Sequence, residues 1–455
     1  MNKIEMYFMG HLTPKKFSKL QERLDKAVQN APESESLLKI LKILFTTEEA
    51  NYAYQLPLSF FTLEEAMKIL KKNKIDCLAI LNNLADKGFL FDFENSTTKA
   101  FFVAPPMPGF FEFALMRTNG NFDKKILCEL FQEYVNNEDD LLKSLMDNNP
   151  LAGRVFIQEN AIEKQKNSKS VILDYEKVSH IINNSAEISV GLCYCRHKKE
   201  HLGKACNNPQ RTCLSFNQVA KSLIKHKISE KITKKEAFEI INDSINRGLV
   251  QIGDNIQNDV NVICNCCSCC CTVLESYQKF GYSDNFTSNF ISECGDNCIG
   301  CGLCKAKCPV NSITIEKKKG KKEAFIEKNK CIGCGICVNI CPKNNLSLIR
   351  KDKLKIVPKD TFERIVLQAI NKGKLQNYIF ENQTSITQNI LRKFLKVILT
   401  LSPLKFLAAN KQLKSKFLNM LIKQKKFSAF RNIYYKDQKI NYNHDEFDRI
   451  KNKNL

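Results

Sequence analysis

Residues 298–310 read CIGCGLCKAKCPV, and residues 331–343 read CIGCGICVNICPK. Both stretches follow one pattern, C-x2-C-x2-C-x3-C-P, and the second begins 33 residues after the first. Glycines between the cysteines allow the backbone to aim amide groups at sulfur, and a proline turns the chain away after each fourth cysteine. Four cysteines at this spacing suit a [4Fe–4S] cluster, so the repeat predicts two clusters in one small unit. Zinc is the alternative metal, and two full quartets that are each followed by proline disfavour it.

This repeat closely resembles the two-cluster bacterial ferredoxin domain, and the resemblance covers residues 293–350. In such domains the fourth sulfur of each cluster comes from the opposite half of the repeat. The resemblance therefore implies one-electron transfer, without a particular substrate. It also implies two ligand sets, namely Cys298, Cys301, Cys304 and Cys341 for the first cluster, and Cys331, Cys334, Cys337 and Cys308 for the second.

The cysteines of the whole chain are concentrated in one part of it. Of 21 cysteines in 455 residues, 19 fall between Cys193 and Cys341, and only Cys77 and Cys128 lie outside. Clustered cysteines without an N-terminal apolar leader indicate metal ligation in a reducing compartment rather than disulfides. No run in the sequence reaches the roughly 18 apolar residues that are needed to span a bilayer. We therefore expect a cytoplasmic protein.

A second group of cysteines precedes the repeat. It has the spacing C-x-C-x10-C-x6-C from Cys193 and is followed by CNCCSCCC at 264–271. We expect one or two further iron–sulfur clusters, or one larger or non-cubane cluster with an open iron; zinc is the alternative. The predicted ligands are Cys193, Cys195, Cys206, Cys213, Cys264, Cys266, Cys267, Cys269, Cys270 and Cys271.

Several neighbours of these cysteines have open roles. His197 or His201 could replace one sulfur ligand. Arg196 either offsets the charge of the cluster or lies on the surface. Cys294 is spare, and either completes an upstream cluster or is simply buried.

The N-terminal part shows a run of helical patterns followed by two short apolar strands. Helices are predicted at 37–45, 63–71 and 76–87, and the strands FLFDF and AFFVAP flank a polar turn. This order resembles the winged-helix domain, over residues 37–105. The exposed face of the third helix would offer Cys77, Asn82, Asn83, Asp86 and Lys87, with no arginine to read guanine. DNA binding is therefore not expected.

Together these segments predict an α+β multidomain chain. Its parts are a winged-helix-like domain at 1–135, a cysteine-rich α/β domain at 150–292, the ferredoxin-like domain at 293–350 and a basic helical tail at 351–455. Candidate strands of the middle domain are 171–174, 188–192 and 249–252. The combined layout resembles multidomain ferredoxin-type iron–sulfur proteins of anaerobes. That resemblance implies no agreed reaction.

The net charge of +22 is concentrated at the C-terminal end. Residues 351–455 hold 23 Lys or Arg against 8 Asp or Glu, a surplus of 15, and no acidic residue lies between Asn382 and Lys436. Two amphipathic helical stripes with interleaved lysines fall within residues 385–430. Such segments either bind a membrane surface peripherally or pack on protein. A basic surface also favours an acidic redox partner.

Three functions remain open on this evidence. The first is an electron-transfer protein or the electron-wiring subunit of an oxidoreductase. The second is an oxidoreductase whose upstream cluster, within residues 193–271, is itself the catalytic site. The third, least favoured, is a redox-sensing DNA-binding regulator. Enzymatic activity stays undecided, because the sequence has no Walker A loop, G-x-G-x-x-G loop or Ser-His-Asp set.

Overall fold

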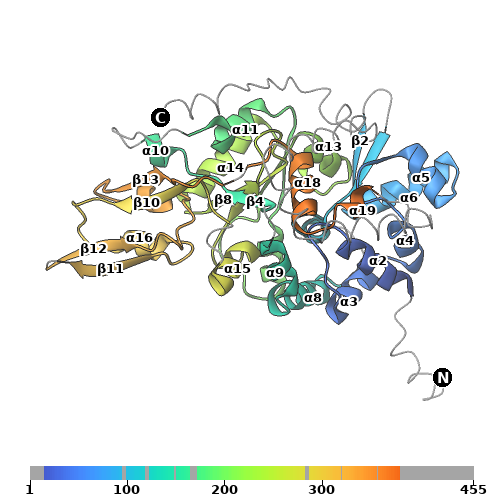
Figure 1. The fold of residues 1–455 in the computed structure, drawn as a ribbon, viewed down its shortest axis with the longest axis horizontal. Coiled ribbons are helices and arrows are strands. Elements are labelled where there is room, and N and C mark those ends of the chain that lie inside the picture. Colours follow the sequence, from blue (N-terminus) through green and yellow to red (C-terminus); the bar gives the residue numbers. More distant parts are fainter. Residues whose placement is uncertain are drawn as a thin grey trace, which may run out of the picture.

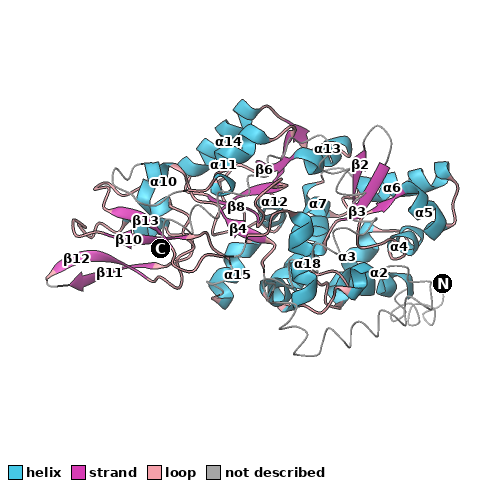
Figure 2. Ribbon diagram, turned by 45° about the horizontal axis from the view of Figure 1, so that its top comes forward, coloured by secondary structure: helices cyan, strands magenta, loops and turns pink. Residues whose placement is uncertain are grey.

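The computed structural model describes residues 15–94, 99–117, 122–147, 150–163, 172–281, 286–318, 320–355 and 357–379. Figure 1 shows N-terminal helices at one end of the molecule, the ferredoxin-like strands at the other, and a cysteine-rich sheet between them. Figure 2 shows the same order from a second direction. In the described ranges, no helix is both long and apolar enough to cross a membrane.

The N-terminal region is helical with a small sheet. Its helices are α2 (Lys15–Asp25), α3 (Glu35–Leu44), α4 (Thr47–Ala53), α5 (Leu63–Leu70) and α6 (Lys74–Asp86). Its strands are β1 (Phe61–Thr62), β2 (Leu90–Glu94) and β3 (Lys99–Val103), in the antiparallel order β1-β3-β2.

Local sequence explains why these elements form where they do. The side chains of Thr46 and Thr62 each accept a hydrogen bond from the backbone N–H three residues later. The residue at that position is a glutamate, whose carboxylate accepts a hydrogen bond from the backbone N–H of the threonine. Helices α4 and α5 therefore begin with capping boxes. The three predicted helices and the hairpin are confirmed, and α4 is an additional helix. Cys77 is fully buried, so it does not belong to the exposed face of the third predicted helix. The resemblance of this region to winged-helix domains stays a prediction.

A linker of helical turns leads to the middle of the molecule. It comprises η1 (Pro106–Phe110), α7 (Phe111–Met116), α8 (Lys124–Gln132), η2 (Glu133–Asn137) and α9 (Asp140–Met146). Phe110 of this linker packs on Phe45, which follows α3, and on Phe89, which precedes β2, with ring centroids 5.4–5.5 Å apart.

The middle region is a six-stranded antiparallel sheet in the order β4-β8-β9-β6-β5-β7. Its strands are β4 (Gly153–Val155), β5 (Ile188–Leu192), β6 (Arg211–Phe216), β7 (Glu230–Lys231), β8 (Val250–Asp254) and β9 (Val262–Cys266). Its helices are α10 (Asn160–Glu163), η3 (Asp174–Glu176), α11 (Val178–Asn184), α12 (Tyr194–His201), α13 (Asn217–Lys225), α14 (Lys234–Asn246) and α15 (Thr272–Phe280).

Two of the three predicted strands in this region are confirmed, as β5 and β8. The strand predicted at 171–174 is wrong, because its described part is loop that enters the short helix η3. Glu176 of η3 accepts a backbone hydrogen bond from Leu173 N–H at 2.9 Å, which favours a turn there.

The ferredoxin-like region contains two small sheets. Strand β10 (Phe290–Cys294) pairs with β13 (Leu346–Arg350), and β11 (Ile313–Lys318) pairs with β12 (Lys321–Ile326), all antiparallel. The short helices α16 (Leu303–Lys307) and α17 (Ile336–Asn339) each carry the third cysteine of one half of the repeat.

The chain then returns to its own beginning. Helices α18 (Thr361–Asn371) and α19 (Gln376–Ile379) pack on residues that follow α2, and Lys374 Nζ donates to Ala27 O at 2.9 Å. Residues 361–379 were assigned to the basic tail and are folded onto the N-terminal region. The amphipathic segment 385–430 lies outside the described residues.

A buried charge cluster joins the N-terminal hairpin to α13. His226 Nε2 lies 3.0 Å from Asp92 Oδ1, and His226 Nδ1 lies 2.6 Å from Asp86 Oδ1. Lys225 and Ser222 also bond Asp92. Burial lowers the pKa of His226, but the bonds to Asp92 and Asp86 outweigh it and raise that pKa above its usual value.

We predict that His226→Gln destabilises the protein by about 2 kcal/mol at pH 6, because it removes hydrogen bonds between charged groups. A raised folded-state pKa means that the stabilisation is complete below the unfolded pKa and is lost as pH rises through the folded value. The difference in melting temperature from wild type should therefore shrink toward pH 9. A difference that does not change between pH 6 and pH 9 would contradict this account.

Candidate iron–sulfur centres

The ferredoxin-like repeat brings its cysteines together in two quartets. Open space of about 380 Å³, including part that opens to solvent, is lined by Cys298, Cys301, Cys304 and Cys341. In the second quartet, the Cys334 thiol interacts electrostatically with those of Cys337, Cys331 and Cys308. Each group thus contains one cysteine from the opposite half of the repeat. The assignment of these cysteines as cluster ligands stays a prediction.

Amide and hydroxyl groups surround these sulfurs. Gly300 N–H and Ala324 N–H each donate to Cys298 Sγ at 3.4 Å. In the second quartet, Ser292 Oγ lies 3.1 Å from Cys337 Sγ, and Ser312 Oγ lies 3.2 Å from Cys308 Sγ. Hydrogen bonds to sulfur stabilise the more negative, reduced state of a cluster and so raise its potential.

The two quartets differ in exposure. Cys301 is exposed, and the adjacent Ile299 and Leu303 are 54% and 48% exposed. In the second quartet Cys331, Cys334 and Cys337 are all buried. The loop around Gly333 is pressed against β10, since a Cβ there would lie 2.1 Å from Phe290 O. The first quartet therefore faces solvent and the second faces the protein interior.

The ten upstream cysteines fall into two separate sets. In the first set, each sulfur interacts with two other sulfurs of the set, and these contacts close a ring. The contact between Cys213 Sγ and Cys264 Sγ measures 3.7 Å. In ring order, the six are Cys193, Cys195, Cys271, Cys266, Cys264 and Cys213.

The sheet explains how this cysteine ring forms. Cys213 lies on β6 and Cys264 on the neighbouring strand β9, beside the register pair Leu214 and Ile263. Cys264 and Cys266 are two residues apart on β9, so their side chains lie on one face of the sheet. Cys193 and Cys271 precede the first residues of α12 and α15, and Cys195 is in the first turn of α12.

The second set is the cysteine quartet Cys206, Cys267, Cys269 and Cys270, whose four sulfurs all lie within 4.8 Å of one another. The distances from Cys206 Sγ to Cys267 Sγ and from Cys270 Sγ to Cys206 Sγ are 3.7 and 3.8 Å. Bonds of about 2.3 Å from a tetrahedral zinc ion place its four sulfurs about 3.8 Å apart. The quartet therefore has the dimensions of a site for one ion.

The cysteine ring has different dimensions. Among the described residues, no three ring sulfurs lie within 4.8 Å of one another, and the quartet is the one group that meets this limit. One tetrahedral ion could not bind three ring sulfurs without moving them, whereas a polynuclear cluster binds each thiolate through a different metal atom. The residues present thus fit a polynuclear centre.

Two buried cations accompany the upstream cysteines. Arg196 is fully buried, donates to Asn265 O at 2.6 Å and to Thr212 Oγ1 at 2.9 Å, and lies beside Cys267 and Cys193. The surface alternative for Arg196 is therefore wrong. Lys198 Nζ is also buried and donates to Asn136 Oδ1 at 2.5 Å. Contact with Cys270, together with Arg196, lowers the pKa of Cys267 to about 4, which favours the thiolate that binds metal.

Three further residues do not take the roles considered for them. His197 Nδ1 lies 2.7 Å from Leu115 O, and its Nε2 lies 3.1 Å from His201 Nε2, so the two rings bond each other rather than replace a sulfur. Cys294 lies beside Cys298 in the ferredoxin-like region. Completion of an upstream cluster by Cys294 is therefore excluded.

The cysteine ring and the second ferredoxin quartet share one apolar core. That core includes Cys266 and Cys271 of the ring, and Cys334 with its neighbours Ile332 and Ile336. Helix α15 bridges the two regions, as Tyr277 Oη donates to Lys330 O and Gln278 Nε2 donates to Pro309 O, both at 2.8 Å. The other side of the ring packs on the N-terminal region, where Cys193, Cys195 and Cys213 join its core.

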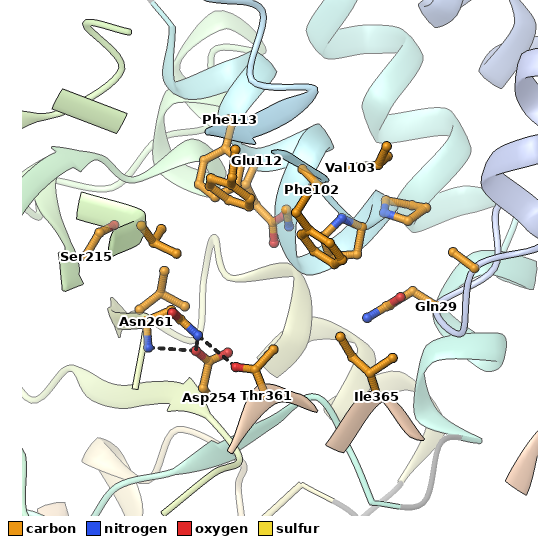
Figure 3. Close-up of a pocket in the computed structure, with 18 of the residues that line it drawn as sticks. Gln29, Phe102, Val103, Glu112, Phe113, Ser215, Asp254, Asn261, Thr361 and Ile365 are labelled. Atoms are coloured by element: carbon orange, nitrogen blue, oxygen red, sulfur yellow. Dashed lines mark hydrogen bonds between the residues drawn. The ribbon is translucent and has the colours of Figure 1, made fainter. Parts of the chain in front are cut away.

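A large cavity lies where the N-terminal region, the middle sheet and α18 meet (Figure 3). Its open space is about 1220 Å³, including the part open to solvent, and its walls are mainly apolar. Two ring cysteines, Cys213 and Cys264, form part of the wall together with Tyr194. No local sequence motif predicts this cavity, because its lining residues come from segments far apart in the chain.

Glu112 is the notable polar group of the cavity. Its carboxylate accepts a hydrogen bond from Gly109 N–H, and Figure 3 shows the side chain directed between Phe113 and Phe102 into the cavity. Burial raises the pKa of Glu112 well above its usual value, and the nearby Cys264 and Cys195 thiolates add to the effect. Sequence reasoning missed Glu112, which is a single acidic residue in an apolar helix.

Comparison with known families gives one result. Residues 297–345 match the family model of the 4Fe-4S dicluster domain. No curated protein matches the chain. The match supports [4Fe–4S] binding in the ferredoxin-like region, and with the upstream cysteine cluster it indicates iron–sulfur electron transfer.

We predict that Ser292→Ala lowers the reduction potential of one ferredoxin cluster by tens of millivolts, because the change removes a hydroxyl next to Cys337 Sγ. Redox titration followed by EPR measures this shift. Thr314→Ala is the matched control, since the Thr314 hydroxyl bonds Glu316 rather than a sulfur. Equal potentials in wild type and Ser292→Ala would contradict the assignment.

Proposed function

We propose that this chain is the electron-wiring part of an oxidoreductase, in which two ferredoxin clusters deliver single electrons to a polynuclear iron–sulfur centre on the cysteine ring. The ligands of the two ferredoxin clusters would be the two crossed quartets described above. The observation that carries the proposal is the shared apolar core, which contains Cys334 of the second quartet together with Cys266 and Cys271 of the ring.

Differences in exposure support a direction for the electrons. The first quartet has an exposed cysteine flanked by exposed apolar side chains, whereas three of the four cysteines of the second quartet and most of the ring are buried. Electrons would therefore enter at the first cluster, pass to the second and end at the ring. Close packing along this path matters because electron transfer slows steeply with distance.

The entry face also indicates a partner. Lysines on α16 and on the β11–β12 hairpin are exposed near the first quartet, namely Lys305, Lys307, Lys321 and Lys322. A positive surface around an exposed redox centre attracts an acidic donor and speeds encounter. We propose an acidic, low-potential one-electron donor as the partner. Peripheral membrane binding through residues 385–430 remains a separate proposal based on sequence.

The experiment is iron and sulfide analysis with Mössbauer spectroscopy on anaerobically purified wild type and Cys266→Ser. The ferredoxin clusters account for about eight irons per chain. We expect more than that in wild type, and a loss confined to the additional irons in Cys266→Ser. About eight irons in both proteins would contradict a polynuclear iron centre on the ring.

For the cysteine quartet we propose a single structural zinc ion, on the sulfur distances given above. Cys206→Ser should remove about one zinc per chain and leave the iron content unchanged. Cys266→Ser should do the reverse. Metal analysis of the two variants beside wild type measures both outcomes, and loss of iron without loss of zinc in Cys206→Ser would refute the zinc assignment.

A further inference from the structure

The cavity at the junction of the three regions is the feature that electron transfer alone does not use. An electron carrier has no need of a large apolar cavity next to its terminal centre. Here two cysteines of the ring, Cys213 and Cys264, form part of the cavity wall. A molecule bound in the cavity would therefore contact the last centre of the electron path.

The lining of the cavity defines the chemistry of its occupant. Phe60, Phe91, Phe93, Phe102 and Phe113 make the wall strongly apolar. Arg364 is the one basic residue among the described lining residues, and its Nη1 is bonded to Asp254 Oδ1 at 3.0 Å. The charge of this one lining cation is thus already paired with a carboxylate, so an uncharged molecule fits best.

The polar groups at the base of the cavity bond one another. Asn261 N and Nδ2 donate to Asp254 Oδ2 at 2.8 and 3.0 Å, and Asn261 Nδ2 also bonds Thr361 Oγ1 at 3.1 Å (Figure 3). Glu112 is different, because it lies on the apolar side and its carboxylate accepts a hydrogen bond from the backbone amide of Gly109. A protonated carboxyl in this position can donate to an acceptor oxygen of a ligand.

We propose that this cavity binds a largely apolar, uncharged small molecule whose carbonyl oxygen accepts a hydrogen bond from Glu112, and that the molecule is reduced beside the cysteine ring. This inference rests on the proposed function for its electrons. In the reduction, C=O becomes CH–OH. The two electrons come from the external one-electron donor through this chain, one proton comes from Glu112 and the other from water, and water then reprotonates Glu112.

The first test measures binding to the full chain with prodan, a neutral fluorescent naphthalene that carries a ketone. Wild type should bind prodan and shift its emission to the blue. Ile365→Trp fills the cavity from α18 and should weaken binding about tenfold or more. Phe362→Trp, on the same helix but outside the lining, should bind as wild type does. Absence of binding to wild type, or equal binding by Ile365→Trp, would overturn the proposal.

The second test concerns Glu112. In Glu112→Gln, we expect prodan to bind within a few-fold of wild type, while its reduction under a low-potential donor slows about 100-fold. Bound prodan should also change the EPR spectrum of the additional irons, but not that of the ferredoxin clusters. Binding without any reduction or spectral change would refute reduction at the ring.

The two proposals fail in different ways. If the ring holds no iron, the iron content fails to exceed that of the ferredoxin clusters, while prodan binding persists. If the cavity is not a substrate site, the iron content is as expected and prodan binding is absent or insensitive to Ile365→Trp.

Discussion

Six sulfurs brought together in a buried ring are the constraint on which the rest of this structure depends. Thiolates are costly to bury unless positive charge compensates them. Metal ions would supply most of that charge, and the buried Arg196 and Lys198 supply more. The regions on either side keep water from the ring: the N-terminal core packs on Cys193, Cys195 and Cys213, and α15 with the ferredoxin loops packs on Cys266 and Cys271.

This arrangement gives each region a physical role. The ferredoxin-like region presents one quartet to solvent and the other to the ring, so it has an outer and an inner end. The N-terminal region and α18 close a cavity against the ring rather than present a free surface. Asn83 of α6 and Lys87 at its C-cap are bonded to Glu49, and Asp86 is bonded to His226, so these side chains are engaged within the chain rather than free to contact DNA.

Spacing and periodicity predicted the local features well. The dicluster repeat, the N-terminal helices and hairpin, β5 and β8 all follow from patterns within short windows. The division of ten upstream cysteines into a ring of six and a quartet could not be predicted, because it depends on the pairing of β6 with β9 and on the turn that separates Cys266 from Cys271. Within the CNCCSCCC stretch, Cys264 and Cys266 lie on strand β9, and the remaining cysteines follow it. The position of Glu112 in the cavity, and the cavity itself, depend on contacts between segments far apart in the chain. No short stretch of sequence contains those contacts.

The central claim is that electrons pass from the ferredoxin clusters to a centre on the ring. Rapid-freeze EPR after mixing the oxidised full chain with reduced methyl viologen tests it most directly. The account predicts that ferredoxin-cluster signals appear first and that the signal of a further iron centre changes afterwards at their expense. Fully reduced ferredoxin clusters with no change at any further centre would contradict it.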